Sequence, residues 1–442
     1  MPSRWLRTGI VALLLGTLFA VGGDARADLL DYVNKPDDSF AWKLKEKSAG
    51  EENTVYTLEL TSQTWHGIVW KHSVQVFLPK DVKPGATMLL YNTGGGPSLT
   101  VALFGLEVAK RTRAPVAVLY DIPNQPLLDG KREDALIAET FVRALETKDF
   151  SWPLLAPMVK SVVRCMDALQ AFAREEWKTE VKHFVVSGAS KRGWTAWLTA
   201  ATQDPRVVAI VPMVIDTLNM QEQMAHQKES FGRYSEMIRD YTARGLVPLP
   251  DGEDAKKLWA MVDPYSYRDK ITIPKLLILG NNDRYWTADA LNLYWSGLKG
   301  DTYITYVPNA GHNLVQLGVP PERNRARMLN ALSAFSRAQV TGKPLPKLSW
   351  KHDDVDGRLR LTVQCDPPPK GARLWVATAP TRDFREATWK EKPAQVDGKT
   401  VVGQVAAPVE CCLAFYAEMD YELDGIPYTL CTQLRIAAAK AE

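Results

Sequence analysis

A serine stands between two glycines in the segment Gly188-Ala189-Ser190-Lys191-Arg192-Gly193. An apolar run precedes this segment and a helix-compatible stretch follows it, so we expect Ser190 at a sharp bend between a buried strand and a helix. A serine hydroxyl is a weak nucleophile alone, and such a bend can hold its oxygen toward a histidine and backbone donors. The second glycine comes one position later than in G-x-S-x-G, and the alternative interpretation is an ordinary turn.

Two later strands supply candidates for the acid and the base of a catalytic triad. Asp283 follows one predicted strand, and His312 follows the next. The chain order Ser190, Asp283, His312 is typical of α/β-hydrolases, which deliver these residues at the carboxyl edge of a parallel sheet. The alternatives are that Asp283 forms a turn and that His312 stabilises a loop. Asp216 also ends a predicted strand and is the rival candidate for the acid.

A glycine-rich stretch before the nucleophile is a candidate site for the negative charge that serine attack creates. The segment Thr93-Gly94-Gly95-Gly96-Pro97 follows an apolar strand, where lipases and esterases carry an HGGG-type loop. The backbone N–H groups of Gly94, Gly95 and Gly96, with that of Lys191, are therefore the predicted oxyanion donors. The alternative is a plain glycine turn. A phosphate-binding P-loop is excluded, because the sequence lacks G-x-x-x-x-G-K-[ST].

Lys191 and Arg192 place two cations at the start of the predicted helix, where the helix dipole already presents positive potential. Two interpretations of Lys191 are open: it supports the oxyanion or a substrate carboxylate, or its side chain is solvated or forms a structural ion pair. We also predict that Arg192, Trp194 and Trp286 contact the substrate.

Residues 1–27 have the three parts of a secretory signal peptide. Arg4 and Arg7 form a basic start, residues 9–21 are a short apolar core, and Ala25-Arg26-Ala27 is a small-x-small cleavage site. The sequence therefore predicts cleavage after Ala27 and a periplasmic or secreted protein. The apolar core is too short for a stable anchor, so no membrane anchor is expected.

The composition is typical of a large globular protein. The 442 residues are 46% hydrophobic, and the net charge of +3 falls to +1 once three arginines and one aspartate are removed with the signal peptide. A nucleic-acid partner is therefore not expected. We expect a small-molecule or peptide substrate and no cofactor, and the sequence leaves the oligomeric state open.

Five cysteines in an exported chain predict disulfides, with one cysteine left over. Cys165 lies alone in a helix-like stretch and is predicted to be a buried thiol. Cys365, Cys411, Cys412 and Cys431 cluster near the carboxyl end, and their three possible pairings stay open, although a bond between Cys411 and Cys412 would be strained. No metal site is predicted, because no histidine or C-x-x-C spacing accompanies the four.

The chain divides into a long α/β part and a short all-β part. Residues 53–92 alternate like antiparallel strands, and strands then alternate with helices, which predicts a mainly parallel sheet with helices on both faces. This pattern is typical of an α/β-hydrolase domain, which we place at residues 28–341. After a linker, short strands separated by turns predict an immunoglobulin- or fibronectin III-like β-sandwich over residues 347–442. Those strands are expected at residues 358–363, 372–377, 401–405, 413–418 and 428–436.

An insertion at residues 217–269 interrupts the alternation and resembles the lid of a hydrolase. It is rich in methionine and aromatic residues, which suit an adaptable apolar pocket wall or simply pack the insertion onto the core. The residues concerned are Met220, Met224, Phe231, Tyr234, Met237, Tyr241, Trp259 and Met261.

Segments across nearly the whole chain after the signal peptide resemble the PhoPQ-activated pathogenicity-related proteins. The resemblance lies in Asp31-Tyr32-Val33, Leu60-Thr61-Ser62-Gln63-Thr64-Trp65, Ile122-Pro123-Asn124-Gln125-Pro126-Leu127, Phe184 to Trp194, Asp204-Pro205-Arg206-Val207, Val211 to Met220 and Val307 to His312. It implies an exported α/β-hydrolase-type protein, in bacteria under a two-component regulator linked to envelope stress and virulence, with no settled substrate. Where relatives carry Asp-Glu-Phe-Phe, this chain has Asp283-Arg284-Tyr285-Trp286. The serine motif alone is also similar to that of glucuronoyl esterases.

These features favour an exported serine hydrolase, an esterase or a peptidase-like enzyme, that uses Ser190, His312 and Asp283. The competing hypothesis is a non-catalytic signalling or binding protein on the same scaffold, because secreted growth-regulating relatives exist.

Overall fold

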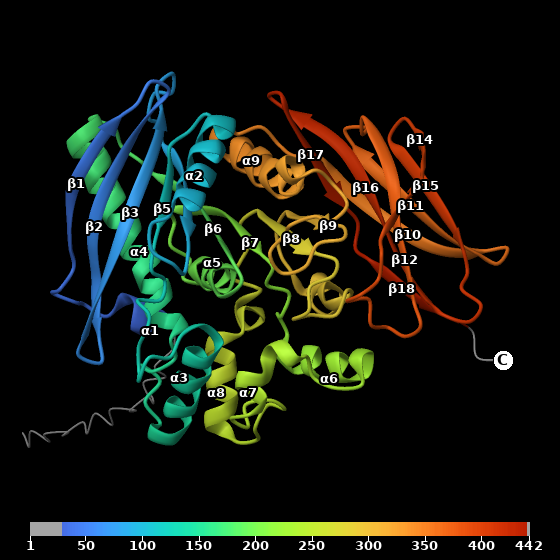
Figure 1. Cartoon of the computed structure of the whole chain (residues 1–442), viewed down its shortest axis with the longest axis horizontal. Helices are drawn as coiled ribbons and strands as arrows, with labels where there is room; N and C mark the ends of the chain where they lie inside the picture. The colour runs from blue at the N-terminus through green and yellow to red at the C-terminus, as the bar shows by residue number, and fades with distance from the viewer. Residues whose placement is uncertain (1–28, 440–442) are drawn as a thin grey trace, which may run out of the picture.

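The computed structural model describes residues 29–439, so the predicted signal peptide lies outside the described residues. Figure 1 shows a large central sheet with helices around it and, at the right, a separate group of C-terminal strands. Within residues 29–439, none of the helices combines the length and the hydropathy that a membrane span needs.

The central sheet has nine strands in the order β1-β2-β3-β5-β4-β6-β7-β8-β9. Strands β1 to β3 pair antiparallel, β3 pairs antiparallel with β5, and every pair from β5 to β9 is parallel. Consecutive residues in β6 are both fully buried, Val185 in one apolar cluster and Val186 in the other, so both faces of the sheet are covered. The strands are Ala41–Ala49, Asn53–Trp65, Ile68–Pro79, Thr87–Asn92, Val116–Leu119, His183–Ala189, Val207–Met213, Lys275–Gly280 and Thr302–Val307, for β1 to β9.

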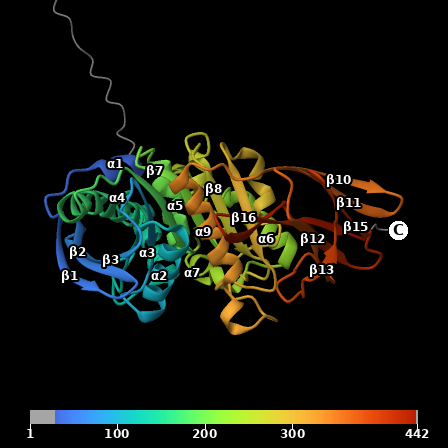
Figure 2. The same cartoon turned by 90° about the horizontal axis from the view of Figure 1, so that it is seen from above.

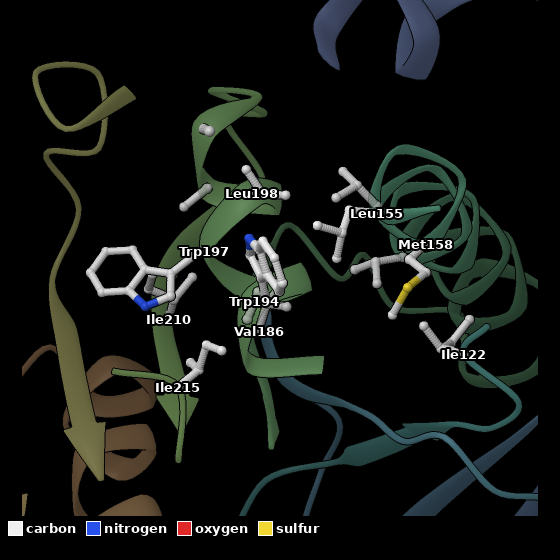
Figure 3. Packing of buried hydrophobic residues seen from close by; sticks show 14 of the residues in the cluster. Ile122, Leu155, Met158, Val186, Trp194, Trp197, Leu198, Ile210 and Ile215 are labelled. Carbon is white, nitrogen blue, oxygen red and sulfur yellow. The ribbon is translucent and has the colours of Figure 1, made fainter. Parts of the chain in front are cut away.

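Helices pack on both faces of this sheet, as predicted. On one face, α4 (Leu155–Phe172) and α5 (Lys191–Ala201) bury Leu155, Met158 and Trp197 against the sheet, as Figure 3 shows. On the other face lie α2 (Leu99–Thr112) and α9 (Ala326–Thr341), which share the second apolar cluster. A short first helix, α1 (Leu29–Asn34), packs on α4.

The predicted lid-like insertion is helical and lies between β7 and β8. It contains α6 (Met220–Phe231), α7 (Arg239–Thr242) and α8 (Glu253–Val262). Helix α3 (Glu133–Thr147), which follows β5, contacts both α7 and α8. In Figure 1 these four helices gather below the sheet, at its carboxyl edge.

The C-terminal strands form two antiparallel sheets that share one apolar core, which is the predicted β-sandwich. One sheet has the order β10-β11-β15-β14, and the other has the order β13-β12-β16-β17 with β18 also paired to β16. Their bounds are Lys347–Val355 (β10), Arg358–Asp366 (β11), Gly371–Ala379 (β12), Lys390–Pro393 (β13), Gln395–Asp397 (β14), Thr400–Ala406 (β15), Cys412–Leu423 (β16), Ile426–Cys431 (β17) and Arg435–Ala438 (β18). Figure 2 shows this group from above, at the end of the molecule opposite β1.

The single strand predicted for residues 428–436 is wrong, because two strands occupy this stretch. β17 and β18 both pair with β16, and Thr432 lies between them. The Thr432 N–H donates to the Ala417 carbonyl at 3.0 Å, but the Ala417 N–H donates to the Thr432 hydroxyl at 3.1 Å, so a side chain takes the place of one backbone acceptor at this point.

Candidate active site

Ser190 occupies the tight turn between β6 and α5, with φ 58° and ψ −127°. A residue other than glycine is strained at such a positive φ, so the surrounding structure has to hold it there. The Ser190 N–H donates to the Met213 carbonyl at 2.9 Å, and the Ser190 carbonyl accepts from the Trp194 N–H at 2.9 Å. The turn is therefore fixed by β7 on one side and by α5 on the other.

The two glycines around Ser190 allow the strand and the helix to approach closely. A Cβ atom on Gly188 would lie 2.6 Å from the Arg192 carbonyl oxygen, and one on Gly193 would lie 2.9 Å from the Met213 carbonyl oxygen. Both distances are too short for a side chain, so this turn needs glycine at both positions.

The three residues predicted as a triad lie within hydrogen-bond distance of one another. His312 Nε2 is 2.8 Å from Ser190 Oγ, and His312 Nδ1 is 2.7 Å from Asp283 Oδ2. The other carboxylate oxygen of Asp283 accepts the Tyr285 N–H at 2.9 Å, which orients the carboxylate. The three side chains follow β6, β8 and β9, whose parallel arrangement brings their ends to one edge of the sheet.

The rival acid, Asp216, lies nearby but makes a different bond. Its Oδ1 accepts the Tyr294 hydroxyl at 2.6 Å, and its carboxyl is buried. Burial and, to a smaller degree, the charge of Asp283 raise the pKa of Asp216 to about 7, against the lowering effect of the Tyr294 hydrogen bond. The structure therefore pairs His312 with Asp283, and Asp216 is a second buried carboxyl behind it.

The cations after Ser190 are both buried and both paired with carboxylates of α3. Lys191 Nζ lies 2.6 Å from Asp134 Oδ2, and the Arg192 guanidinium makes two hydrogen bonds to Glu133, at 2.6 and 2.8 Å. For the Lys191 side chain, the structure shows the structural ion pair that was one of the two alternatives. Arg192 was predicted to contact the substrate. Its side chain instead bonds Glu133 and the Ile122 carbonyl, behind the turn that carries Ser190.

Sequence reasoning missed Glu133, Asp134 and Tyr285 as parts of this site. Burial alone would raise the pKa of Glu133, but the hydrogen bonds and charge of Arg192 outweigh it and lower the pKa to about 2. Asp134 also accepts the hydroxyls of Tyr241 and Tyr285, both at 3.0 Å. The only local signal was an acidic pair in the first turn of a predicted helix, which the helix dipole explains by itself.

The glycine loop lies directly beside the nucleophile turn. A Cβ atom on Gly94 would be 1.8 Å from the Arg192 guanidinium, so the loop backbone rests on this side chain. The Gly94 carbonyl accepts from the Gln125 amide at 3.2 Å, and the Gly95 carbonyl accepts from the Asp121 N–H at 3.2 Å. The carbonyl oxygens thereby anchor the loop to the segment after β5.

A largely apolar cavity opens next to Ser190. Two of the predicted substrate contacts, Trp194 and Trp286, line it together with Ser190 and Lys191. The insertion supplies much of the wall, through Met220, Met224, Ile238, Tyr241, Val247 and Trp259. Of the two alternatives for the insertion, Met220, Met224, Tyr241 and Trp259 follow the first and line the cavity.

The C-terminal sandwich braces the loops that carry Asp283 and His312. The Asn282 amide donates to the carbonyls of Phe384, Arg385 and Ala387, at 3.2, 3.3 and 2.7 Å. Asn309 exchanges two hydrogen bonds with the backbone of Trp389, at 2.7 and 2.9 Å. Residues 384–389, here named the bracing segment, are therefore part of what holds the acid and the base in place.

The predicted disulfides are wrong, because the cysteines of the described chain are all free thiols. Cys431 faces Glu418 on β16 and Cys412 begins the same strand, so the two thiols are about 20 Å apart along it, far beyond disulfide reach. Cys365 lies in the other sheet of the sandwich. The expected buried thiol of Cys165 is confirmed, and its burial raises its pKa.

The strand order of the central sheet, with a serine at the strained turn after β6, defines an α/β-hydrolase fold. The family model described as PhoPQ-activated pathogenicity-related protein matches residues 29–385. Autocrine proliferation repressor protein A from Dictyostelium discoideum is 35% identical over 401 residues, which cover 85% of this chain and 79% of that protein. The chain belongs to the PhoPQ-activated pathogenicity-related protein family, as its sequence segments indicated.

Among solved structures, the chain is similar to several esterases at low sequence identity. An acetyl xylan esterase from Paenibacillus sp. R4 is 14% identical with a TM-score of 0.48, over 68% of this chain and 90% of that one. Acetyl xylan esterase 1 from Thermoanaerobacterium sp. JW/SL YS485 is 18% identical with a TM-score of 0.47, over 64% and 86%. A glucuronoyl esterase from Solibacter usitatus is 10% identical with a TM-score of 0.41, over 66% and 88%.

Proposed function

We propose that this protein is a serine hydrolase that cleaves ester or amide bonds through an acyl-enzyme on Ser190. The observation that carries the proposal is the continuous hydrogen-bonded row Asp283–His312–Ser190, with bonds of 2.7 and 2.8 Å. The strained backbone of Ser190 supports it further, because strain of this kind is concentrated at functional sites.

In the first half of the reaction, Ser190 Oγ attacks the substrate carbonyl carbon while His312 Nε2 takes the hydroxyl proton. Asp283 keeps the proton of the imidazole on Nδ1, so that Nε2 is free to act as the base. When the tetrahedral intermediate collapses, the bond to the leaving group breaks and His312 returns its proton to the departing alcohol or amine. The acyl group then stays on Ser190 as an ester.

In the second half, a water molecule attacks the acyl-enzyme while His312 again takes a proton. Collapse of this second intermediate returns the proton to Ser190 Oγ and releases the carboxylic acid. The same two hydrogen bonds therefore serve both halves of the cycle.

Backbone donors are proposed to stabilise the negative oxygen of both intermediates. The N–H of Lys191 is the first of α5, where no intrahelical acceptor exists for it. The carbonyls of Gly94 and Gly95 are turned toward neighbouring segments, which supports the N–H groups of Gly94, Gly95 and Gly96 as the remaining donors.

A fluorophosphonate probe tests the proposal directly, because it reacts with activated serines. We expect stoichiometric labelling of the wild-type protein, no labelling of Ser190→Ala, and unchanged far-UV circular dichroism in the variant. Absence of labelling in folded wild-type protein, or equal labelling of Ser190→Ala, would remove the hydrolase proposal.

A second candidate function is a non-catalytic signalling or binding protein, favoured by the name of one relative. Autocrine proliferation repressor protein A, 35% identical to this chain, is named for repression of proliferation. If Ser190→Ala kept the full effect of the wild-type protein on cell growth, that effect would be independent of hydrolysis.

We further infer that the chain is exported with cleavage after Ala27. The basic start, the apolar core and the Ala25-Arg26-Ala27 site support this inference. Intact mass of the protein recovered from a periplasmic or culture-medium fraction should correspond to a chain that begins at Asp28. A chain that retains Met1 in those fractions would contradict it.

A further inference from the structure

We propose that the cavity beside Ser190 receives the acyl part of the substrate and that this acyl part is uncharged and apolar, an aliphatic chain or an aromatic ring. The inference rests on the proposed serine hydrolase function and names its substrate class. It follows from the chemistry of the cavity wall and from the position of the cavity relative to His312.

The wall is built for apolar contact. Trp194, Met224 and Ile238 come from α5, α6 and the segment before α7, and each is more than nine-tenths buried. The volume open to the centre of a water-sized molecule is about 60 Å³. This exceeds the roughly 10–15 Å³ that one water needs, so the cavity has room for a small group.

The charges at the cavity are already neutralised within the protein. Lys191 pairs with Asp134 at 2.6 Å, and Asp134 also accepts the hydroxyls of Tyr241 and Tyr285. A charged acyl group would therefore find no free counterion in the cavity, and burying its charge there would be strongly unfavourable. An uncharged apolar group has no such cost and gains by leaving water.

The cavity lies on the acyl side of the scissile bond rather than on the leaving-group side. A leaving group has to reach His312 Nε2 to receive its proton. Ser190 and Lys191 border the cavity. His312 is not among the described residues that line it. The ring of Tyr285, whose centroid is 4.3 Å from that of His312, lies at the boundary between the two sides. The part of the substrate that stays on Ser190 is thus the part that the cavity can hold.

A series of p-nitrophenyl esters with acetyl, butyryl, hexanoyl and octanoyl groups tests this inference. We expect kcat/KM to rise about fourfold per added methylene until the cavity is full, since each buried methylene gains transfer free energy. The p-nitrophenyl hemisuccinate should be at least about 100-fold poorer than the butyrate, because its carboxylate lacks a partner in the cavity. A profile that is flat within twofold, or a hemisuccinate as good as the butyrate, would overturn the inference.

Two methionines of the insertion form a matched pair of variants. Met224 and Met261 are both buried, but only Met224 lines the cavity. Met224→Ala should enlarge the cavity and move the preferred acyl chain toward longer esters by about two carbons. Met261→Ala should lower Tm to a similar degree and leave the chain-length profile unchanged. Equal profiles for both variants would place the acyl group elsewhere.

Binding to Ser190→Ala separates this inference from the proposed function. The variant should bind the same p-nitrophenyl esters without turnover, and Kd should fall along the series from acetyl to hexanoyl. Chain-length discrimination in binding without fluorophosphonate labelling of the wild type would retain the cavity assignment and remove catalysis. Normal labelling with no chain-length discrimination in binding or turnover would retain catalysis and remove the cavity assignment.

Discussion

The two sides of the proposed catalytic triad are held by different parts of the chain. On the nucleophile side, Lys191 and Arg192 are tied by buried ion pairs to α3, which belongs to the same α/β part as Ser190. On the acid and base side, Asn282 and Asn309 are tied to backbone atoms of the bracing segment in the C-terminal sandwich. The position of the nucleophile is therefore set within one fold unit by charge, while the positions of its partners depend on a second unit through amide hydrogen bonds.

The largest expected effect comes from removing the charge on the acid side. Asp283→Asn should lower kcat by about 10⁴-fold, because an amide neither fixes the required imidazole tautomer nor stabilises its protonated form. The matched control is Asp216→Asn, which should change kcat less than threefold. Both are measured on p-nitrophenyl butyrate, and a comparable loss in the two variants would show that the acid role is shared.

The pH dependence of stability offers a second test on the acid side. The pKa of Asp216 in the folded protein is about 7, so unfolded chains lose this proton near pH 4 while the folded protein retains it. The stabilisation of the folded protein by the protonated Asp216 carboxyl is fully present below pH 4 and is lost as pH rises through 7. It amounts to about 1.4 kcal/mol per pH unit, or of the order of 4 kcal/mol in total.

Urea unfolding of the wild type and of Asp216→Asn between pH 4.5 and 7.5 measures this contribution. The difference in unfolding free energy between the two should change steadily with pH in favour of the variant. A difference that is independent of pH would mean that Asp216 ionises near its ordinary pKa in the folded state. Asp263, whose pKa burial raises to about 6, is present in both proteins and cancels in the comparison.

On the nucleophile side, Glu133→Gln should cost about 2 kcal/mol of unfolding free energy. Breaking a fully buried pair costs about 3–5 kcal/mol, and the partial exposure of Glu133 reduces this. Glu253→Gln, on α8, is the control, because its i,i+3 pair with Lys256 is exposed to solvent and contributes little to stability. Denaturant unfolding gives both values, and equal losses would argue against a special role for the buried pair.

The smallest expected effect comes from loosening the brace. Asn282→Ala should lower kcat about tenfold with KM nearly unchanged, because a displaced Asp283 weakens a contact needed mainly in the transition state. Asn292→Ala is the control: Asn292 also bonds the sandwich, at Leu434, but is adjacent to neither Asp283 nor His312 in the sequence. A rise in KM in place of the loss in kcat would indicate that the brace shapes the cavity instead.

The sequence was sufficient to predict the sheet and the meeting of Ser190, Asp283 and His312, because parallel strands deliver their carboxyl ends to one edge. It was insufficient for the charge pairs. Glu133 and Arg192 are 59 residues apart, and nothing in either local pattern indicates the other. Asn282 and Asn309 are ordinary turn residues by sequence, and their role depends on a tertiary contact more than 75 residues away.

The cysteines and the last strands illustrate a different limit. Compartment and cysteine number favoured disulfides, but strand register places Cys412 and Cys431 far apart along β16. Apolar alternation favoured one strand over residues 428–436, but the Thr432 hydroxyl replaces a backbone acceptor near the middle of this stretch. In both cases the deciding feature was pairing between strands, which local sequence patterns do not contain.

Under the proposed hydrolase function, the bracing segment makes turnover a reporter of how the two halves of the chain are joined. A protein cut within the connection between α9 and β10 would keep Ser190 on its own scaffold, yet three carbonyls that receive the Asn282 amide could depart with the severed half. Hydrolysis would then fall as the halves dissociate and return as they reassociate, so that dilution alone would lower the activity of the nicked protein.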